Sequence, residues 1–301
     1  MNSLKDLRVQ ISLSVPPNHL KLGIPPRELD RAMLSTCMAI VRAGATVVYG
    51  GDLRPDGFTF KIFRHLARAY ANTGSVPFIH AVNYVSLSNM SFDVLFAALK
   101  ERRGTCQTFL CVEGTMKAAS LDDDYIVVSD REASIELEAA SFPSWVAGLE
   151  HLEPPQKEIT RARATIAGYI DATVAIGGKM GLLANQADGY LGGMPGILEE
   201  SFLTLELGKP FIPLAAYGGA TRDLAIKLEL LGTESWIPRD AQVDNYNVAL
   251  ETAQSYRDRI PTDIAPMLAK LADDDRTEIV ARETVKIIRS WLDGKQVRLE
   301  G

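Results

Sequence analysis

The sequence lacks a long apolar run and an excess of basic residues. No stretch approaches the ~20 apolar residues that a bilayer-spanning helix needs, and the opening MNSLKDLRVQ has no apolar core of a signal peptide. The formal net charge is −6, which leaves no broad basic face for nucleic acid or acidic lipid. We therefore expect a cytoplasmic protein that binds neither nucleic acid nor a membrane.

Cysteine is also scarce. The chain has three cysteines, Cys37, Cys106 and Cys111, and the last two are too far apart for the C-x-x-C spacing of metal ligands. We interpret them as reduced thiols, as is usual in the cytoplasm. The histidines show no ligand spacing either, so we expect no metal and no cofactor.

Two common nucleotide-binding motifs are missing. Neither G-x-G-x-x-G nor the Walker A spacing occurs in the sequence. These absences exclude the usual dinucleotide and P-loop fingerprints. Phosphate binding by other glycine turns stays open.

Short β-branched runs alternate with amphipathic stretches along most of the chain, and this alternation predicts βα units. The expected strands are 7–15, 45–51, 76–85, 171–178 and 209–219, and the expected helices are 26–44, 58–74, 92–104, 156–170, 195–208 and 221–232. The pattern predicts an α/β fold of the Rossmann-like, doubly wound type, with a mainly parallel sheet flanked by helices and a C-terminal helical extension.

The less regular regions give further expectations. Residues 108–114 and 124–130 read as a strand pair, and residues 131–152 as helical by composition. We expect a binding domain over residues 1–240, with a seam near Pro154–Pro155, and a helical extension over 241–301.

Three predicted strands end in a glycine pair: Gly50–Gly51, Gly177–Gly178 and Gly218–Gly219. Parallel strands would bring all three turns to the carboxyl edge of the sheet, where open α/β sheets bind ligands. Glycine accepts positive φ and lets backbone N–H groups approach an anion. A single such turn is more often only a turn, but three together favour a phosphate-bearing ligand.

A long glycine-rich loop follows the second pair. Seven glycines lie between residues 177 and 196, together with apolar residues that can pack over a ligand. Loops of this length are usually functional or disordered, and the composition is not that of a disordered segment. We interpret it as a lid or binding loop, with Lys179 and Gly196 as candidate contacts.

Polar residues near these turns are candidates with structural alternatives. Ser12 and Ser14 end the first strand and suit either a phosphate or a strand-end cap; Arg54 follows the first glycine pair. Glu199 and Glu200 lie in the first turn of a helix, where acidic residues also simply complement the helix dipole.

Together these segments resemble the SLOG superfamily. The resemblance rests on an arginine-bearing helix before DATVAIGG, on the helix start GILEE, and on ISLS followed by a long helix and GATVVYGGDLRPDGFTF; it runs from about residue 9 to residue 231. The superfamily includes LOG-type nucleoside 5′-monophosphate phosphoribohydrolases, once labelled lysine decarboxylases. It also includes nucleotide-sensing modules of bacterial defence and stress systems.

The resemblance implies roles for two residues. Arg163 matches the arginine that the hydrolases keep ahead of the D-A-x-x-A strand, and Glu200 matches the catalytic acid of P-G-G-x-G-T-x-x-E. The sequence departs from that motif, because an insertion separates Gly178 from Gly196 and Ile197 replaces the threonine. The insertion looks closer to sensor branches, which are thought to bind NAD-derived ligands such as ADP-ribose species.

We therefore expect a sensor that binds a nucleotide or an ADP-ribose-like ligand and forms homo-oligomers. The alternative is a LOG-like N-glycosidase that hydrolyses a nucleotide, with Glu200 assisting water attack and Arg163 holding the phosphate. The sequence leaves open whether the ligand is cleaved.

Overall fold

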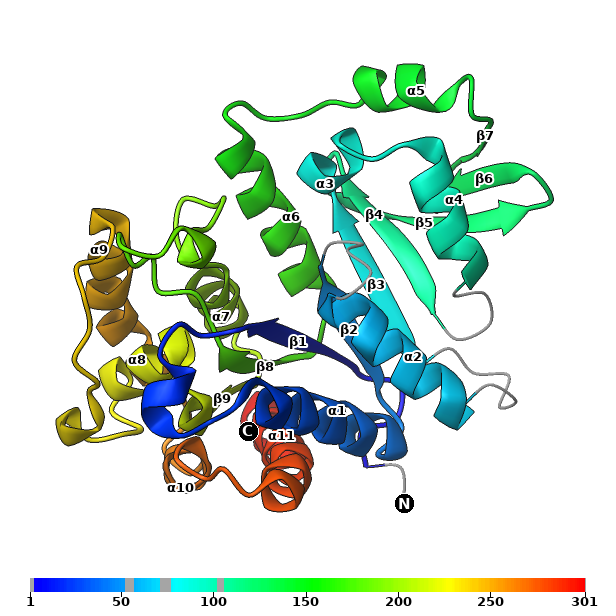
Figure 1. Ribbon diagram of the computed structural model, residues 1–301. Coiled ribbons are helices and arrows are strands. Elements are labelled where there is room, and N and C mark those ends of the chain that lie inside the picture. Colours follow the sequence, from blue (N-terminus) through cyan, green and yellow to red (C-terminus); the bar gives the residue numbers. More distant parts are fainter. Residues whose placement is uncertain (1–2, 52–56, 71–76, 102–105, 301) are drawn as a thin grey trace. The chain divides into compact units, whose positions relative to one another are not determined.

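The computed structural model describes residues 3–51, 57–70, 77–101 and 106–300 (Figure 1). The chain divides into two compact units. The first unit comprises residues 1–45 and 170–301, and the second comprises residues 46–169. Each unit contains strands and helices of its own.

The first unit contains three parallel strands in the order β1 (Arg8–Ser14), β8 (Ala172–Gly177) and β9 (Phe211–Leu214). All six residues of β8 are buried, as expected for a central strand covered on both faces. Ser14 is paired with Gly177, so β1 and β8 end at the same level. This common end forms the carboxyl edge of the unit.

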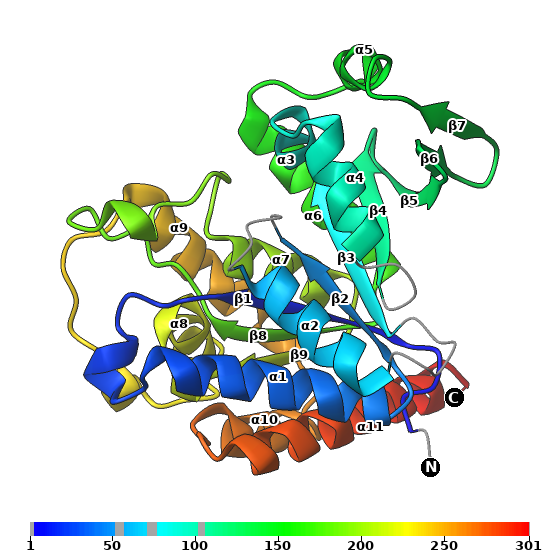
Figure 2. The same cartoon turned by 45° about the vertical axis from the view of Figure 1, so that its right-hand side comes forward.

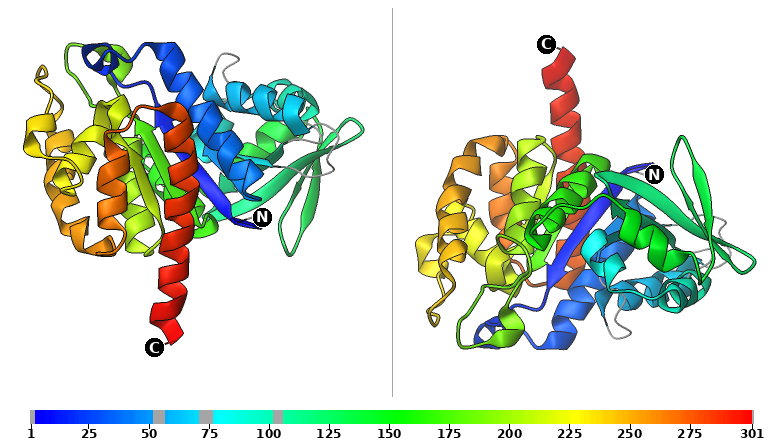
Figure 3. Two further views of the ribbon diagram at one scale, coloured as in Figure 1. Left: turned by 90° about the horizontal axis from the view of Figure 1, so that it is seen from below. Right: turned by 90° about the horizontal axis from the view of Figure 1, so that it is seen from above.

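Helices cover both faces of these strands. The helices of this unit are α1 (Pro26–Arg42), α7 (Gly196–Glu206), α8 (Gly219–Lys227), α9 (Asp244–Ala253), α10 (Ala265–Ala272) and α11 (Thr277–Glu300). Figure 2 shows α1, α10 and α11 together on one side of β1, β8 and β9, and α7 packs on β8 and β1. Figure 3 shows α11 running beside α10 and extending beyond it.

The second unit begins with parallel strands and ends with antiparallel ones. Its strands follow chain order: β2 (Thr46–Gly50), β3 (Phe78–Asn83), β4 (Gln107–Val112), β5 (Thr115–Asp122), β6 (Tyr125–Ser129) and β7 (Ser134–Leu137). β2, β3 and β4 pair in parallel, and β4 to β7 pair antiparallel. Its helices are α2 (Phe58–Tyr70), α3 (Tyr84–Ser88), α4 (Phe92–Glu101), α5 (Phe142–Gly148) and α6 (Pro155–Tyr169).

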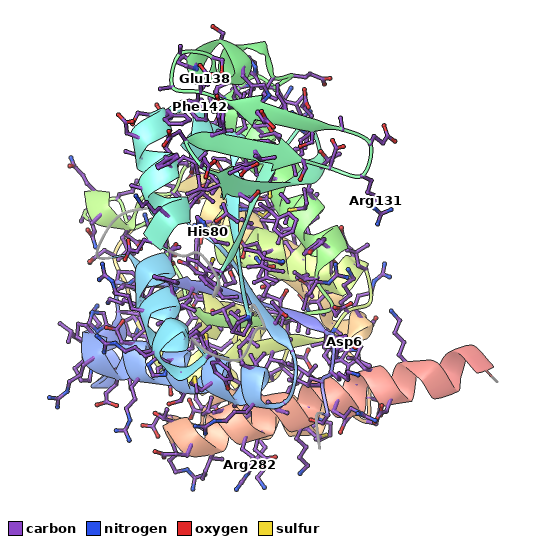
Figure 4. All side chains as sticks on the ribbon, turned by 90° about the vertical axis from the view of Figure 1, so that its right-hand side faces the viewer. Asp6, His80, Arg131, Glu138, Phe142 and Arg282 are labelled. Carbon is purple, nitrogen blue, oxygen red and sulfur yellow. The ribbon has the colours of Figure 1, made fainter. Side chains whose placement is uncertain are left out.

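An aromatic cluster anchors the core of the second unit. Phe142, marked in Figure 4, is 2% exposed and lies edge-on to Phe92, with ring centroids 6.0 Å apart. Trp145 packs on the same ring from the next turn of α5. Such aromatic pairs stabilise a core beyond the area that they bury.

The α/β, Rossmann-like class with a mainly parallel sheet is confirmed, and the C-terminal stretch is helical as predicted. The prediction that residues 131–152 are helical is wrong, because the segment contains β7 and only the short helix α5. The sequence does not predict β5, because its residues are mostly exposed or half-buried and give no strong apolar alternation.

The C-terminal helices belong to the first unit, where α11 packs against α1 and β9. The proposed division at residue 240 remains a prediction. Within the described ranges, no helix has the length and apolar character required to cross a membrane.

Candidate functional site

The carboxyl edge of the first unit is built from two glycine pairs that lie against each other. Gly177 and Gly178 have φ of 70° and 109°, and Gly218 and Gly219 have φ of 81° and 65°. A Cβ added to Gly219 would lie 2.4 Å from the carbonyl oxygen of Gly178. Only glycine allows both this backbone conformation and this approach. The prediction that positive φ underlies these turns is confirmed for both pairs.

At least three of the backbone N–H groups at this edge already have protein partners. Gly218 donates its N–H to the Ala215 carbonyl at 3.0 Å. Gly178 donates its N–H to the Ser14 carbonyl at 2.9 Å. Gly219 donates to Oδ1 of Asn18 at 2.9 Å, and Asn18 is 5% exposed. The loop between β1 and α1 is thereby joined to the start of α8. Phosphate contacts at this edge would have to come from other donors.

One such donor set is the start of α7. The helix begins at Gly196 after Pro195. The Pro195 carbonyl accepts a hydrogen bond from the Glu199 N–H at 3.1 Å. A helix start carries the positive end of the helix dipole, which favours an anion. Gly196 therefore keeps its place in the candidate site.

A polar row runs along the face of β1 that α7 covers. Gln10 reaches Glu200 on α7, and the period of two places Ser12 and Ser14 on the same face of the strand. Gln10 is 3% exposed and Ser12 is 4% exposed, whereas Ser14 is half-buried. Buried polar side chains are costly unless they are hydrogen-bonded. In an ordinary core, apolar residues would occupy these positions.

The two glutamates of α7 differ in environment. Glu199 is 7% exposed and buried, while Glu200 is half-buried. Oε2 of Glu200 accepts a hydrogen bond from Nε2 of Gln10 at 2.9 Å. Glu200 is thus the carboxylate that solvent can reach.

The glycine-rich loop is organised by the buried carboxylate of Asp188. The backbone N–H groups of Met180 and Leu182 donate to it at 3.1 Å and 2.8 Å. Burial raises the pKa of Asp188, and these hydrogen bonds oppose the rise. Nζ of Lys179 donates to the Gly189 carbonyl at 2.5 Å. The loop is therefore folded on itself around a carboxylate.

The same loop is fastened to the segment that precedes α9. Val243 donates its N–H to the Gly181 carbonyl at 2.9 Å. Further along, Nδ2 of Asn245 donates to the Gly193 carbonyl at 2.8 Å, and Oδ1 of Asn245 accepts from the Tyr190 hydroxyl at 2.5 Å. These contacts give the loop a defined position beside α9, so any opening would have to break them.

The remaining predicted residues lie in the second unit. Gly50 and Gly51 end β2 without positive φ, and Nε2 of His80 donates to the Gly51 carbonyl at 2.8 Å. His80 lies on β3, as Figure 4 marks. Arg54 lies outside the described residues. Gly51 is thus bonded to a buried histidine, and the Gly50–Gly51 pair differs in φ from the two glycine pairs of the first unit.

Arg161, one of the two arginines on α6, forms ion pairs within the second unit. It pairs with Glu158 at 2.8 Å and with Glu150 at 3.5 Å. Arg163 is half-buried on the same helix. The role of Arg163 as a phosphate contact stays a prediction from the sequence pattern.

Three residues that shape the site, Gln10, Asn18 and Asp188, were not among the residues predicted from the sequence. Gln10 interrupts an apolar strand, which was a usable sign, whereas Asn18 in its Pro-rich loop and Asp188 in the glycine-rich loop showed nothing unusual. Their roles depend on partners 6 to 201 positions away. In the described part of the chain, no group of three or more His, Cys, Asp or Glu could hold a metal ion.

Comparison with known proteins gives one match to a family. No curated protein matches the chain. The model of the family described as SLOG cluster2 matches residues 3–282, a range that includes every candidate residue and covers parts of both units. The chain therefore belongs to the SLOG cluster 2 family.

Proposed function

We propose that this protein binds a nucleotide or an NAD-derived, ADP-ribose-like ligand and acts as a sensor of bacterial stress or defence type. The observation that carries the proposal is the carboxyl edge of the first unit. There, two positive-φ glycine pairs pack together at the end of a polar row on β1. Family membership supports a nucleotide-related ligand.

In this proposal the phosphates lie at the Gly177–Gly178 turn and the start of α7. Lys179 lies next to the turn and supplies a positive charge once its bond to the Gly189 carbonyl is exchanged for a phosphate oxygen. Arg163 and Arg54 belong to the second unit, and their roles as phosphate contacts stay predictions from the sequence. Ser12 and Ser14 supply hydroxyl groups from β1, and Glu200 accepts hydrogen bonds from the ribose.

A second candidate function is N-glycosidic bond hydrolysis of a nucleotide. The observation that favours it is the half-buried carboxylate of Glu200, held by Gln10 beside the polar row. A carboxylate in this setting can orient a water for attack at the anomeric carbon. The protein would then be an enzyme of the LOG type.

The first experiment is a thermal-shift screen with AMP, ADP, ADP-ribose, cyclic ADP-ribose and NAD, followed by chromatography of each mixture. A ligand that binds only the native state raises its apparent stability. A shift with intact ligand supports the sensor, and release of free base supports the hydrolase. No shift with any of the five compounds would refute the nucleotide site.

Matched variants test the placement of the site. Lys179→Gln should weaken binding of the phosphate-bearing ligand about tenfold, while Lys227→Gln, a half-buried lysine at the end of α8, should leave it unchanged. Equal effects of the two substitutions would remove the assignment of Lys179. Glu200→Gln separates the two functions, because a hydrolase loses turnover and a sensor has none to lose.

A further inference from the structure

The glycine-rich loop of the first unit has two halves that are held in different ways. Residues 178–188 form the inner half, and residues 189–195 form the outer half, which runs directly into the start of α7. In the inner half, Leu182 pairs with Gln242 in an antiparallel bridge, and its N–H donates to the buried carboxylate of Asp188 at 2.8 Å. Backbone pairing and a buried carboxylate therefore fix the inner half.

The outer half is held by side chains. In the described part of the chain, no backbone hydrogen bond joins residues 190–194 to another segment. Instead, Nδ2 of Asn245 on α9 donates to the Gly193 carbonyl at 2.8 Å, and Oδ1 of Asn245 accepts from the Tyr190 hydroxyl at 2.5 Å. Asn245 is exposed, so water competes for both of these bonds. The outer half is therefore the part of the loop that separates most easily.

Both ends of the Asn245 amide are used in this arrangement. The Gly193 carbonyl only accepts hydrogen bonds, so the NH₂ group must face it and the amide oxygen must face Tyr190. The Tyr190 hydroxyl has one hydrogen and donates it to that oxygen. Burial raises the pKa of Tyr190 to about 12, so the hydroxyl keeps this hydrogen at neutral pH. Asn245 thus joins two residues of the outer half to α9.

The glycines of the two halves also differ. Gly181, in the inner half, has a φ of +65°, and an added Cβ would lie 2.6 Å from Cγ2 of Val243. In the outer half, Gly189 has a φ of −63°, and Gly193 has no positive φ and nothing within 4 Å of an added Cβ. The observed conformation therefore requires glycine at position 181 but not at positions 189 and 193. Glycine at those two positions makes other conformations of the outer half accessible.

A third hydrogen bond to the outer half comes from the proposed phosphate site. Nζ of Lys179 donates to the Gly189 carbonyl at 2.5 Å. A phosphate oxygen carries charge and forms a stronger bond with an ammonium group than a neutral carbonyl does. A phosphate at the Gly177–Gly178 turn would therefore take Lys179 away from Gly189. Breaking the bonds of the outer half and binding a phosphate are thus coupled through one lysine.

We propose that residues 189–195 form a lid at the start of α7 and that Asn245 is its latch, which must open before a phosphate-bearing ligand binds. This inference rests on the proposed function, because it places the phosphate at Lys179. The two bonds of Asn245 stabilise the unliganded position of the lid and so lower the fraction of molecules that can bind. Asn245 acts through the lid and does not itself contact the ligand.

The first test needs no ligand. Chymotrypsin is added to the native protein, and cleavage after Tyr190 is followed by mass spectrometry of the fragments, because such cleavage reports the population of the open form. Asn245→Ala removes both latch bonds and should raise this rate about 5- to 30-fold. Asn247→Ala changes another exposed asparagine of α9 and should leave the rate unchanged. Cleavage after Leu183, in the inner half, should stay at the wild-type rate in both variants.

The second test is calorimetry with AMP or with ADP-ribose, whichever shifts the melting temperature more. Asn245→Ala should bind the ligand about 5- to 30-fold more tightly than the wild type, because a larger fraction of molecules has an open lid. Lys179→Met also frees the lid and should be cleaved faster after Tyr190, yet it should bind more weakly because it lacks the cation. The two variants should therefore change the affinity in opposite directions.

The outcomes are distinct for the two proposals. Equal cleavage of Asn245→Ala and the wild type overturns the latch and leaves nucleotide binding standing. A merely structural role for Asn245 predicts unchanged or weaker binding in Asn245→Ala, and either result overturns the lid. A wild type that binds none of the nucleotides refutes the proposed function, and the role of the lid in binding with it.

Discussion

Gly219 provides a test of whether the paired glycine turns require the absence of a side chain. Its φ is +65°, and an added Cβ would lie 2.4 Å from the Gly178 carbonyl oxygen and 2.6 Å from the carbonyl carbon of Gly177. Gly23 has nearly the same φ, +71°, with nothing within 4 Å of an added Cβ. The variants Gly219→Ala and Gly23→Ala therefore share the backbone strain and differ in the collision.

The expected magnitudes follow from these two terms. A left-handed conformation costs a non-glycine residue about 1–2 kcal/mol, so Gly23→Ala should lower the free energy of unfolding by about that amount. Forcing an atom into packed backbone adds about 1–3 kcal/mol. Gly219→Ala should therefore lower the free energy of unfolding by about 2–5 kcal/mol.

The assay is urea unfolding followed by tryptophan fluorescence in a Trp145→Phe background. The remaining tryptophans, Trp236 and Trp291, both belong to the first unit, so the signal reports on the unit that carries both variants. Equal losses for Gly219→Ala and Gly23→Ala would refute the reasoning. That result would mean that the two turns separate without cost when a side chain is added.

Two further predictions concern buried charge and buried thiols. Asp223→Ala should lower the free energy of unfolding by about 3–5 kcal/mol, because it leaves the buried side chain of Arg239 without its carboxylate partner. Asp273→Ala removes a 60% exposed partner of Arg222 and should lower the free energy of unfolding by less than about 1 kcal/mol. Comparable losses for the two variants in denaturant titrations would contradict this reasoning. Burial raises the pKa of the Cys37 and Cys111 thiols to about 12, so both stay protonated and unreactive at pH 8. Ellman's reagent should then modify only the half-exposed Cys106 in the native protein and all three thiols after unfolding, whereas fast modification of all three in the native state would show that the core opens readily.

Local sequence patterns were sufficient for most of the fold. The β-branched run of β8 and the amphipathic period of α1 are properties of adjacent residues, so their positions follow from the side-chain repeat of a strand and of a helix. The antiparallel part of the second unit was harder to predict. β5 and β7 are mostly exposed or half-buried, and such strands depend on pairing with their neighbours more than on their own composition.

The sequence by itself determined the α/β class and two of the three glycine pairs that follow strands, because strand and helix periods and glycine turns depend on short segments. The prediction that Gly218–Gly219 ends a strand is wrong, since β9 ends at Leu214 and a 3-10 turn over Ala215–Tyr217 precedes the pair. Only the tertiary structure decided the partners of these residues. Gln10 meets Glu200 across 190 positions, and Asn18 meets Gly219 across 201, while Arg163 belongs to the second unit and Glu200 to the first. These pairings depend on strand register and helix packing, which are set by the burial of whole faces and not by any local motif.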